Sequence, residues 1–359
     1  MARVALDAMG GDFAPRATVA GALLALADLP AEHTIQLVGR AAVVDETLDA
    51  LFAGEFAAHR TVRDRLEIVD APDVIEMSDK PTVVRSRQGS SMMVGLRLQA
   101  DGKSDAFVSA GNTGAQMAAS VLILRLHAGL TRPAIGTLFP TARKSVVVLD
   151  SGANVDCSPE ELVQFARLGT VYAHDMLGRQ NPAVGLLSIG EEPEKGNAAV
   201  KEAHQLLAQE AAGPGGGAGL NFIGNVEGRD IPHGECDRGP IDVVVCDGFV
   251  GNVLLKFYEA IAPTMMHLFA KTLGADRDEL EAAFKELDYS EHGGAPLLGV
   301  KGVSIISHGK SSPRAIKNAV RLAVRAVESQ MSEHIGRRLA AGGVSHGAVP
   351  NEAAAGPTR

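Results

Sequence analysis

The chain has 359 residues, of which 46% are hydrophobic, and a formal net charge of −9. Domains contain roughly 100–200 residues, so a chain of this length can bury a large core in one domain or in two interlocked ones. The acidic balance argues against broad nucleic-acid binding, and we expect no nucleic-acid partner.

The cysteines and the apolar runs indicate the compartment. Three cysteines, none of them in a CxxC pair, cannot form a disulfide framework, which predicts a reducing, cytoplasmic location. No basic stretch precedes a long apolar run at the N-terminus, so we expect no signal peptide. No run approaches the ~18 apolar residues that are needed to cross a bilayer.

Short apolar runs alternate with longer helical stretches along the chain. The runs predict strands at residues 3–7, 34–38, 66–69, 105–109, 145–150, 184–189, 221–223, 241–246 and 303–306. The longer stretches predict helices at residues 15–28, 41–51, 81–100, 114–128, 159–176, 195–210, 251–272, 276–287 and 312–330. This alternation is typical of an α/β fold with a mostly parallel sheet, which binds ligands at the carboxyl ends of its strands.

No clean linker or internal repeat divides the chain. We expect residues 1–335 to form a single α/β domain or two interlocked subdomains. Residues 336–359, rich in Ala, Gly and Pro, are predicted to be a disordered tail. The glycine-rich run at 213–219 predicts a flexible surface loop.

The first candidate motif, Asp7-Ala8-Met9-Gly10-Gly11-Asp12, follows the first predicted strand. Paired glycines let backbone N–H groups face an anion at the start of a helix. The aspartates would repel phosphate, so they would orient a cation, cap the helix or receive a proton. A tight turn with Asp12 as the N-cap explains the pattern equally well.

The second motif, Ser109-Ala110-Gly111-Asn112-Thr113-Gly114, also lies between a strand and a helix. Its hydroxyl and amide groups with two glycines favour a phosphate or oxyanion cradle. A capping turn alone would need only one such residue. Asp150-Ser151-Gly152-Ala153-Asn154 repeats the design more weakly.

Two acidic segments follow later strands. Gly190-Glu191-Glu192-Pro193-Glu194-Lys195-Gly196 is either a solvated loop or a loop that brings Lys195 to a phosphate. Asn225-Val226-Glu227-Gly228-Arg229-Asp230 and the later Cys246-Asp247-Gly248-Phe249-Val250-Gly251-Asn252 gather polar groups at strand ends. Such groups are costly to bury unless they are paired or functional.

The last motif, His308-Gly309-Lys310-Ser311-Ser312, opens a helix and predicts an anion site. It is not the nucleotide P-loop, because Ser304 stands where that motif needs its first glycine. No GxGxxG fingerprint and no GxSxG elbow follows a predicted strand, and HExxH spacing is missing from the sequence.

Taken in order, DAMGGD, SAGNTGA, GANVDC, GLLSIGEEPEKG, GNVEGRDI, CDGFVGNVLLK, GGAPLLGVKG and ISHGKSS resemble the bacterial phosphate acyltransferase family PlsX. The resemblance spans residues 1 to about 330. It implies transfer of a fatty acyl group from acyl carrier protein to inorganic phosphate, giving acyl phosphate for a membrane acyltransferase that acylates glycerol 3-phosphate. It also implies a Rossmann-like three-layer α/β/α fold resembling phosphotransacetylases and isopropylmalate dehydrogenases, a homodimer that associates peripherally with membranes, and no metal or organic cofactor.

The residue types suggest how such chemistry would be divided. Backbone and side-chain donors of Gly10, Gly11, Ser109, Gly111, Asn112 and Thr113 would line a phosphate pocket. Positive charge or a hydrogen bond would come from Lys195, His308 and Lys310. Orientation of these groups would come from Asp7, Asp12, Glu227, Asp247 and Asn252, with Asn225 and Gly228 beside the substrate. We therefore expect Asn112, Lys195, Asp247, His308 and Lys310 to be catalytic.

The apolar helix predicted at 251–272 is either a buried core or dimer helix, or an acyl-chain groove or membrane contact, with Pro263 expected to kink or interrupt it. Arg85, Arg87, Arg132, Arg143 and Lys144 are either solvated charges or a docking site for the acidic carrier protein. Alternative functions are an acyl-CoA-dependent phosphotransacetylase, a non-catalytic scaffold for lipid synthesis and, by fold analogy alone, a nicotinamide dehydrogenase.

Overall fold

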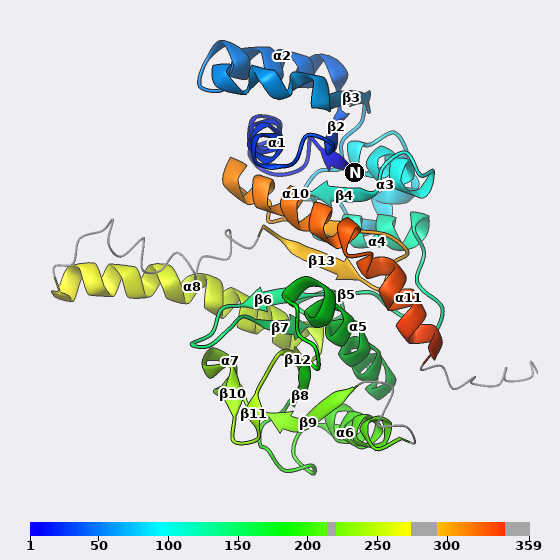
Figure 1. The fold of residues 1–359 in the computed structure, drawn as a ribbon, viewed down its shortest axis with the longest axis vertical. Helices are drawn as coiled ribbons and strands as arrows, with labels where there is room; N and C mark the ends of the chain where they lie inside the picture. The colour runs from blue at the N-terminus through cyan, green and yellow to red at the C-terminus, as the bar shows by residue number, and fades with distance from the viewer. Residues whose placement is uncertain (214–219, 274–292, 342–359) are drawn as a thin grey trace, which may run out of the picture.

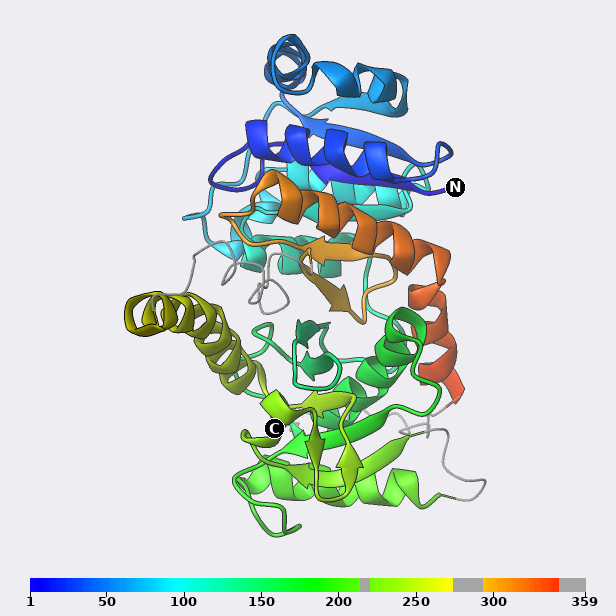
Figure 2. The ribbon, with the colours of Figure 1, turned by 60° about the vertical axis from the view of Figure 1, so that its left-hand side comes forward.

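The computed structural model describes residues 1–213, 220–273 and 293–341. Within these ranges the chain forms two lobes, each built around its own sheet (Figure 1). Figure 2 shows the same two lobes from another side, with a long helix projecting from the second. The predicted α/β fold with mostly parallel sheets is confirmed, although the strands divide into two main sheets.

The first sheet has strand order β3-β2-β1-β4-β14-β13-β5. The first five of these strands are parallel to one another. Strand β13 pairs antiparallel with β14, and β5 pairs antiparallel with β13. In sheet order their bounds are Leu66–Asp70, Thr34–Gly39, Arg3–Asp7, Ala106–Ser109, Ser304–Ile306, Ala295–Leu298 and Ala134–Ile135. Because β1, β4 and β14 are adjacent and parallel, the loops that follow them leave the same edge of the sheet.

Helices cover both faces of this sheet. Val4 and Leu6 of β1 pack into one apolar cluster with α1 and α10, whereas Ala5 packs into another with α3 and α4. This period-two alternation gives three layers. The helical elements of this lobe are α1 (Arg16–Asp28), α2 (Ala41–Ala53), the 3-10 helices η1 (Ala57–Arg65) and η2 (Pro81–Arg85), α3 (Ser91–Ala100), α4 (Thr113–Ile123) and α10 (Pro313–Glu328).

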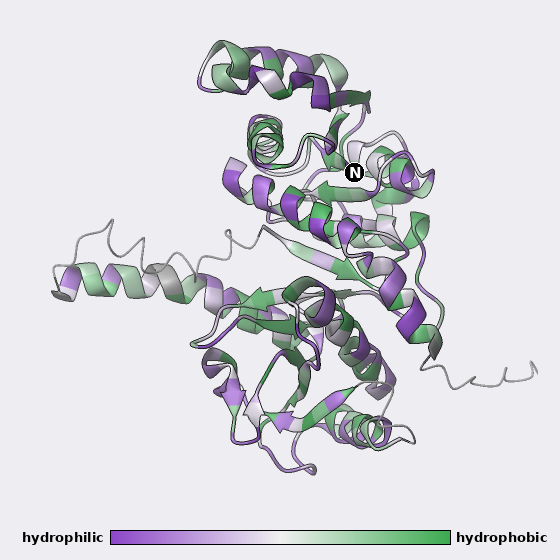
Figure 3. Cartoon of the chain, in the orientation of Figure 1, coloured by the Kyte–Doolittle hydropathy of each residue, from purple (hydrophilic) through white to green (hydrophobic). Residues whose placement is uncertain are grey.

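The second sheet has strand order β6-β7-β12-β8-β9, all parallel except β6. In sheet order the strands are Thr137–Phe139, Val146–Leu149, Val243–Val245, Ala183–Leu187 and Asn221–Val226. A small hairpin of β10 (Glu235–Cys236) and β11 (Gly239–Pro240) lies beside it. Figure 3 shows the apolar character of the strands in both lobes.

Helices α5 (Pro159–Leu177) and α6 (Ala198–Ala211) cover one face of the second sheet. The first turns of α8 (Gly248–Leu273), together with α7 (Asp230–His233), cover the other. Helix α5 begins at a capping box, in which Ser158 and Glu161 bond each other's backbone N–H, and it ends at the left-handed Gly178.

The two lobes share backbone and core. The chain passes from β5 in the first sheet to β6 in the second across Gly136 alone. At the other end, α10 leads into α11 (Met331–Ala341), which packs on α5 of the second lobe. One apolar cluster contains residues of both lobes. The lobes are therefore interlocked at two places.

Several predicted boundaries are wrong for local reasons. The helix predicted at 81–100 is broken at residues 86–90, because Ser90 pairs with Asp73 and caps α3. The helix predicted at 114–128 ends at Ile123, and Arg125 takes a left-handed conformation. The predicted strands do not include β5, β6 and β13, which hold two to four residues each.

The C-terminal boundary also differs from the prediction. Gln330 has a positive φ of 53°, and the chain turns there into α11, which continues to Ala341. The predicted tail at 336–359 is therefore wrong for 336–341, while 342–359 lie outside the described residues. The predicted helix at 276–287 and all but the first residue of the loop at 213–219 also lie outside them. No helix among residues 1–213, 220–273 and 293–341 is long and apolar enough to span a bilayer.

Gly21 lets α1 and α10 pack closely, and its replacement tests this contact. A Cβ at Gly21 would lie 2.5 Å from the Cβ of Ile316. We expect Gly21→Ala to lower the free energy of unfolding by about 1–3 kcal/mol, because overpacking forces the helices apart. Chemical denaturation would measure this. Gly89→Ala is a matched control, since its Cβ would meet nothing nearer than 3.9 Å; equal effects of both substitutions would contradict the close packing.

Candidate functional site

Three of the predicted motifs meet at the carboxyl edge of the first sheet. We call residues 7–12, 109–113 and 308–312, which follow β1, β4 and β14, the first loop group. The backbone N–H of Asp12 donates to the carbonyl of Gly309 at 2.7 Å. A Cβ on Gly10 would lie 2.9 Å from the nitrogen of Gly111. Motifs separated by about 300 residues in sequence thus share one surface.

A buried carboxylate organises this group. Asp7 accepts a hydrogen bond from the Ser109 hydroxyl at 2.8 Å and one from the N–H of Met9 at 3.1 Å. Ser109 Oγ in turn accepts the N–H of Gly111 at 2.9 Å. The only hydroxyl hydrogen of Ser109 is therefore directed at Asp7, so none is left for the predicted hydrogen bond to phosphate. Burial raises the pKa of Asp7.

Both glycines of the first motif are required by close contacts. A Cβ on Gly10 would lie 2.7 Å from Asp7 Oδ2 and 2.9 Å from Ser109 Oγ. Gly11 has a φ of 103° and lies against Gly309. These contacts with neighbouring protein atoms exclude larger residues at both positions. The predicted approach of their N–H groups to an anion stays a prediction.

The structure gives Asn112 a different role from the one predicted. Its Oδ1 caps α4 by accepting the N–H of Ala115 at 3.0 Å. Its Nδ2 donates to the carbonyls of Glu76, Met77 and Asp79 at 3.3, 3.1 and 2.8 Å. The amide hydrogens are committed to the chain itself, so the predicted hydrogen bond to phosphate is not supported.

The remaining residues of the group lie at its rim. Thr113 is the exposed first residue of α4, and Asp12 is exposed. His308 and Lys310 are exposed as well, and His308 Nδ1 accepts the N–H of Lys310 at 3.2 Å. With Nδ1 engaged as an acceptor, a neutral His308 carries its proton on Nε2. Both side chains are therefore open to solvent beside the loops.

A second loop group lies at the carboxyl edge of the second sheet. It consists of four segments at the ends of β7, β8, β9 and β12: residues 150–157, 188–196, 225–230 and 247–252, respectively. The structure therefore brings the predicted residues together as two groups, one in each lobe. The loop at residues 150–154 contacts the first lobe. The N–H of Ile135 in β5 donates to Asp150, and Ala153 packs on the core of the first lobe.

Asp150 is the organising carboxylate of the second group, and sequence reasoning gave it too little weight. It is fully buried and accepts the N–H groups of Ile135, Ala153 and Asn154 at 3.0, 3.0 and 2.7 Å. The amide of Asn154 adds a bond at 2.9 Å. Burial raises the pKa of Asp150 despite these donors. The one sequence signal was an acidic residue directly after an apolar strand.

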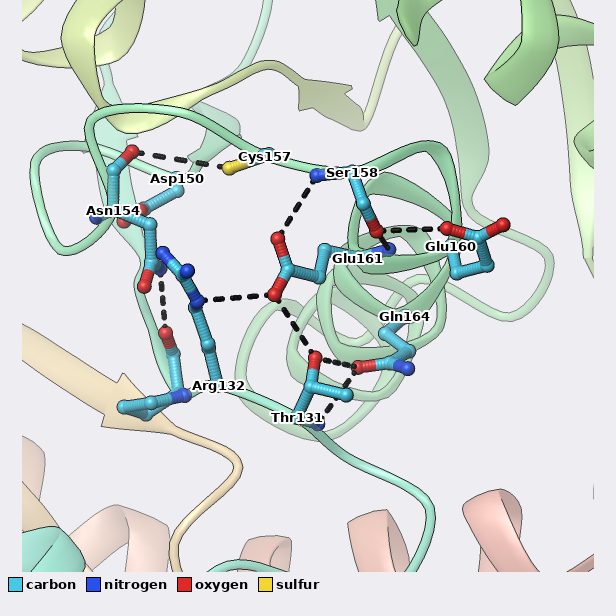
Figure 4. Close-up of polar contacts among 10 residues, drawn as sticks. Thr131, Arg132, Asp150, Asn154, Cys157, Ser158, Glu160, Glu161 and Gln164 are labelled. Atoms are coloured by element: carbon cyan, nitrogen blue, oxygen red, sulfur yellow. Dashed lines mark hydrogen bonds and ion pairs between the residues drawn. The ribbon is translucent and has the colours of Figure 1, made fainter. Parts of the chain in front are cut away.

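Figure 4 shows the polar contacts around this loop. Asn154 also donates to the carbonyl of Pro133 at 2.8 Å. Arg132 pairs with Glu161 at 3.1 Å, and Thr131 bonds the same carboxylate. The start of α5 is thus tied to the segment that enters β5.

Asp247 and Asn252 lie where α8 begins. Asp247 Oδ1 accepts the N–H of Val250 at 2.8 Å, which is a capping contact. Gly251 packs directly on the carbonyl of Asp150, where a Cβ would clash. Asn252 is exposed and lies over Gly152. The observed contact of Asp247 is therefore structural, whereas Asn252 faces outward beside it.

Asn225 and the acidic loop are bound to each other. Asn225 is fully buried, donates to the carbonyl of Glu192 at 2.7 Å and contacts His204 at 3.0 Å. It holds the loop that carries Lys195, which is exposed and folds over Gly190. Glu227 forms an ion pair with Arg229 at 2.9 Å, and Gly228 is exposed beside them. These residues all belong to the second lobe.

The cysteines of the second group are poor nucleophiles. Burial and the neighbouring carboxylates raise the pKa of Cys157 to about 12. The same causes raise the pKa of the buried Cys246 well above its usual range. Because only a thiolate attacks efficiently, an acyl-cysteine intermediate is disfavoured. Among the residues described, His, Cys, Asp and Glu side chains do not gather in threes as metal ligands would.

Replacing Asp7 by Asn tests its raised pKa. A carboxyl whose folded pKa lies above its unfolded value of about 4 contributes stability that is complete below that value. That contribution is lost as pH rises through the folded pKa. We therefore expect the Tm of Asp7→Asn, relative to the parent protein, to increase with pH above about 4.

Thermal denaturation across pH would measure this difference. Ser109→Ala is the matched variant, because it keeps the carboxyl but removes a hydrogen bond that lowers its pKa. It should extend the loss of stability to higher pH. Parallel Tm curves for Asp7→Asn and the parent protein would show that Asp7 does not titrate abnormally.

The chain is similar to known proteins over almost its whole length. The family described as "Fatty acid synthesis protein" matches residues 2–334. A phosphate acyltransferase from Desulfitobacterium hafniense is 45% identical over 350 residues, which cover 94% of this chain and 98% of that protein. A phosphate acyltransferase from a Synechocystis species is 44% identical and covers 93% of both chains.

Solved structures show the same fold at low sequence identity. EutD phosphotransacetylase from Staphylococcus aureus matches with a TM-score of 0.56 and 16% identity over 91% of this chain and 94% of that one. A phosphotransacetylase from Streptococcus pyogenes matches with a TM-score of 0.57 and 17% identity at the same coverage. The predicted likeness to phosphotransacetylases is confirmed. The chain therefore belongs to the bacterial phosphate acyltransferase family PlsX and is an enzyme that transfers acyl groups to phosphate.

Proposed function

We propose that the enzyme takes a fatty acyl group from acyl carrier protein and that its acyl phosphate product serves phospholipid synthesis. One observation carries this proposal: large apolar side chains are exposed on the loops of both groups or beside them. They are Phe13, Met77, Val155, Ile189 and Phe249. An acetyl group would need little apolar surface, whereas a fatty acyl chain gains about 0.8 kcal/mol for each CH₂ that it buries.

The first loop group is suited to bind phosphate. Helices α4 and α10 begin directly at two of its loops, and the partial positive charge of a helix N-terminus favours an anion. Gly10 and Gly11 let backbone approach closely, while Lys310 and His308 add donors at the rim. Asp7 holds the loops without contacting the anion.

The chemistry needs positioning more than acid–base catalysis. A phosphate oxygen attacks the thioester carbonyl carbon, and the resulting oxyanion is stabilised by backbone donors and by Lys310. The intermediate then collapses, the C–S bond breaks and acyl phosphate forms. A thiol has a pKa near 8.5, so the thiolate leaves readily and takes its proton from solvent. The raised pKa values of Cys157 and Cys246 support this direct transfer.

Three of the five cationic residues predicted to dock the carrier protein form ion pairs within the chain. Arg87 pairs with Asp73 at 3.3 Å, Arg132 pairs with Glu161 at 3.1 Å, and Arg143 pairs with Glu235. Arg85 and Lys144 are exposed. We propose these two as the contacts that favour an acidic carrier.

The donor and the role of Lys310 are tested together. We expect phosphate-dependent release of thiol from palmitoyl carrier protein, with acyl phosphate trapped by hydroxylamine, and little release from acetyl-CoA. Lys310→Ala should lower kcat/KM by about 10²–10³-fold if the lysine stabilises the oxyanion. Lys103→Ala is the control, because Lys103 is exposed at the opposite edge of the same sheet. Faster turnover of acetyl-CoA would instead favour a short-chain phosphotransacetylase.

Helix α8 supports the proposed homodimer and peripheral membrane contact of a cytoplasmic enzyme. It runs unbroken from Gly248 to Leu273, so the interruption expected at Pro263 is not seen. Val253, Phe257 and Leu268 are exposed along it, which excludes a fully buried core helix. An exposed apolar surface of this kind indicates a protein or membrane partner.

A charge on this surface tests both contacts. We expect Phe257→Glu to shift the mass measured by light scattering from dimer to monomer, to reduce sedimentation with anionic liposomes, or both, since burying an unpaired carboxylate is costly. Leu122→Glu, at a comparably exposed apolar position on α4, is the control. Unchanged mass and sedimentation would remove α8 from both interfaces.

A further inference from the structure

The side chain of Asn112 attaches the turn at residues 76–79 to the first loop group by hydrogen bonds. The turn closes on itself, because Glu76 N–H donates to Asp79 Oδ2 at 2.9 Å and Asp79 N–H donates to the Glu76 carbonyl at 3.1 Å. Asn112 then binds three carbonyls of this turn through its amide. Just after the turn, Pro81 packs closely on Gly114. A Cβ on Gly114 would lie 2.8 Å from Pro81 Cγ.

Met77, within the turn, reaches across to a loop from a distant part of the sequence. A Cβ on Gly309 would lie 2.9 Å from Met77 Cε. The carbonyl of that glycine is the one that accepts Asp12 N–H, so Met77 lies where two loops of the first group join. The side chain nevertheless remains 47% exposed. It therefore presents apolar surface beside the polar loops.

This surface suits the acyl donor and not phosphate. A thioether offers an inorganic anion neither charge nor a strong hydrogen bond. Methionine is flexible and polarizable, and it adapts to apolar ligands of different shape. An acyl chain whose thioester carbonyl faces the loops would extend past such a residue.

We propose that Met77 is a specificity-determining contact for the part of the acyl chain next to the thioester. We further propose that Asn112 is a positioning residue, which acts by holding Met77 in place. The inference rests on the proposed function, because it assumes a fatty acyl donor at the first loop group. It assigns to Asn112 no contact with either substrate.

A chain-length series tests the role of Met77. Steady-state kinetics would compare acetyl and palmitoyl thioesters on the same carrier protein, with phosphate varied separately. Met77→Ala should raise KM for the palmitoyl donor about 10-fold, a size typical of lost apolar contacts in a binding pocket. KM for phosphate and for the acetyl donor should stay within twofold of the parent values. Met77→Leu should restore the palmitoyl KM, because its volume is similar, and Leu122→Ala is the control at a distant exposed position.

A double-mutant cycle separates positioning from direct binding. Asn112→Asp keeps the oxygen that caps α4 but loses the donors to the 76–79 turn. If Asn112 acts through Met77, the double variant with Asn112→Asp and Met77→Ala should have the same KM for the palmitoyl donor as Met77→Ala alone. Additive losses, or a rise in KM for phosphate, would overturn the positioning role.

Different results would contradict the proposed function and the role of Met77. If the parent enzyme releases no carrier thiol with phosphate, the proposed function is wrong. If it does, but Met77→Ala keeps the parent preference for palmitoyl over acetyl donor, only the present inference is wrong. Met77→Ala alters an exposed side chain, so this arm remains decisive even if Asn112→Asp does not fold.

Discussion

Parallel pairing of β1, β4 and β14 is the constraint on which the first loop group depends. It sends three loops from the same sheet edge, and their backbones then approach within contact distance at Gly10, Gly11 and Gly309. A side chain at these glycines would push the loops apart. The group is therefore built from backbone around the buried Asp7, and the exposed His308 and Lys310 lie at its rim.

Each lobe uses one buried carboxylate to hold its loops. Asp7 organises the first group through Ser109 and the N–H of Met9, and Asp150 organises the second mainly through backbone N–H groups. Burial raises the pKa of both residues, because it disfavours the charged carboxylate. The hydrogen bonds to each carboxylate partly offset this effect.

The structure separates two kinds of polar residue that look alike in a sequence. Asn112 follows β4 and Asn225 lies near the end of β9, and the sequence predicts that both serve the substrate. Their amides instead bind carbonyls of the 76–79 turn and of Glu192. His308 and Lys310 remain exposed. A polar residue at a strand end thus has two possible partners, ligand or loop, and only its neighbours in space show which one it has.

The sequence by itself determined the α/β class, most strands and helices, the glycine-rich turns and the family, because periodicity, turn chemistry and motif order are local properties. Tertiary structure alone decided that the strands form two main sheets, that the predicted residues gather in two groups, and that the Asn112 amide binds the carbonyl of Met77. It also showed that much of α8 is exposed. These features depend on contacts between residues far apart in the chain, which local sequence patterns do not encode.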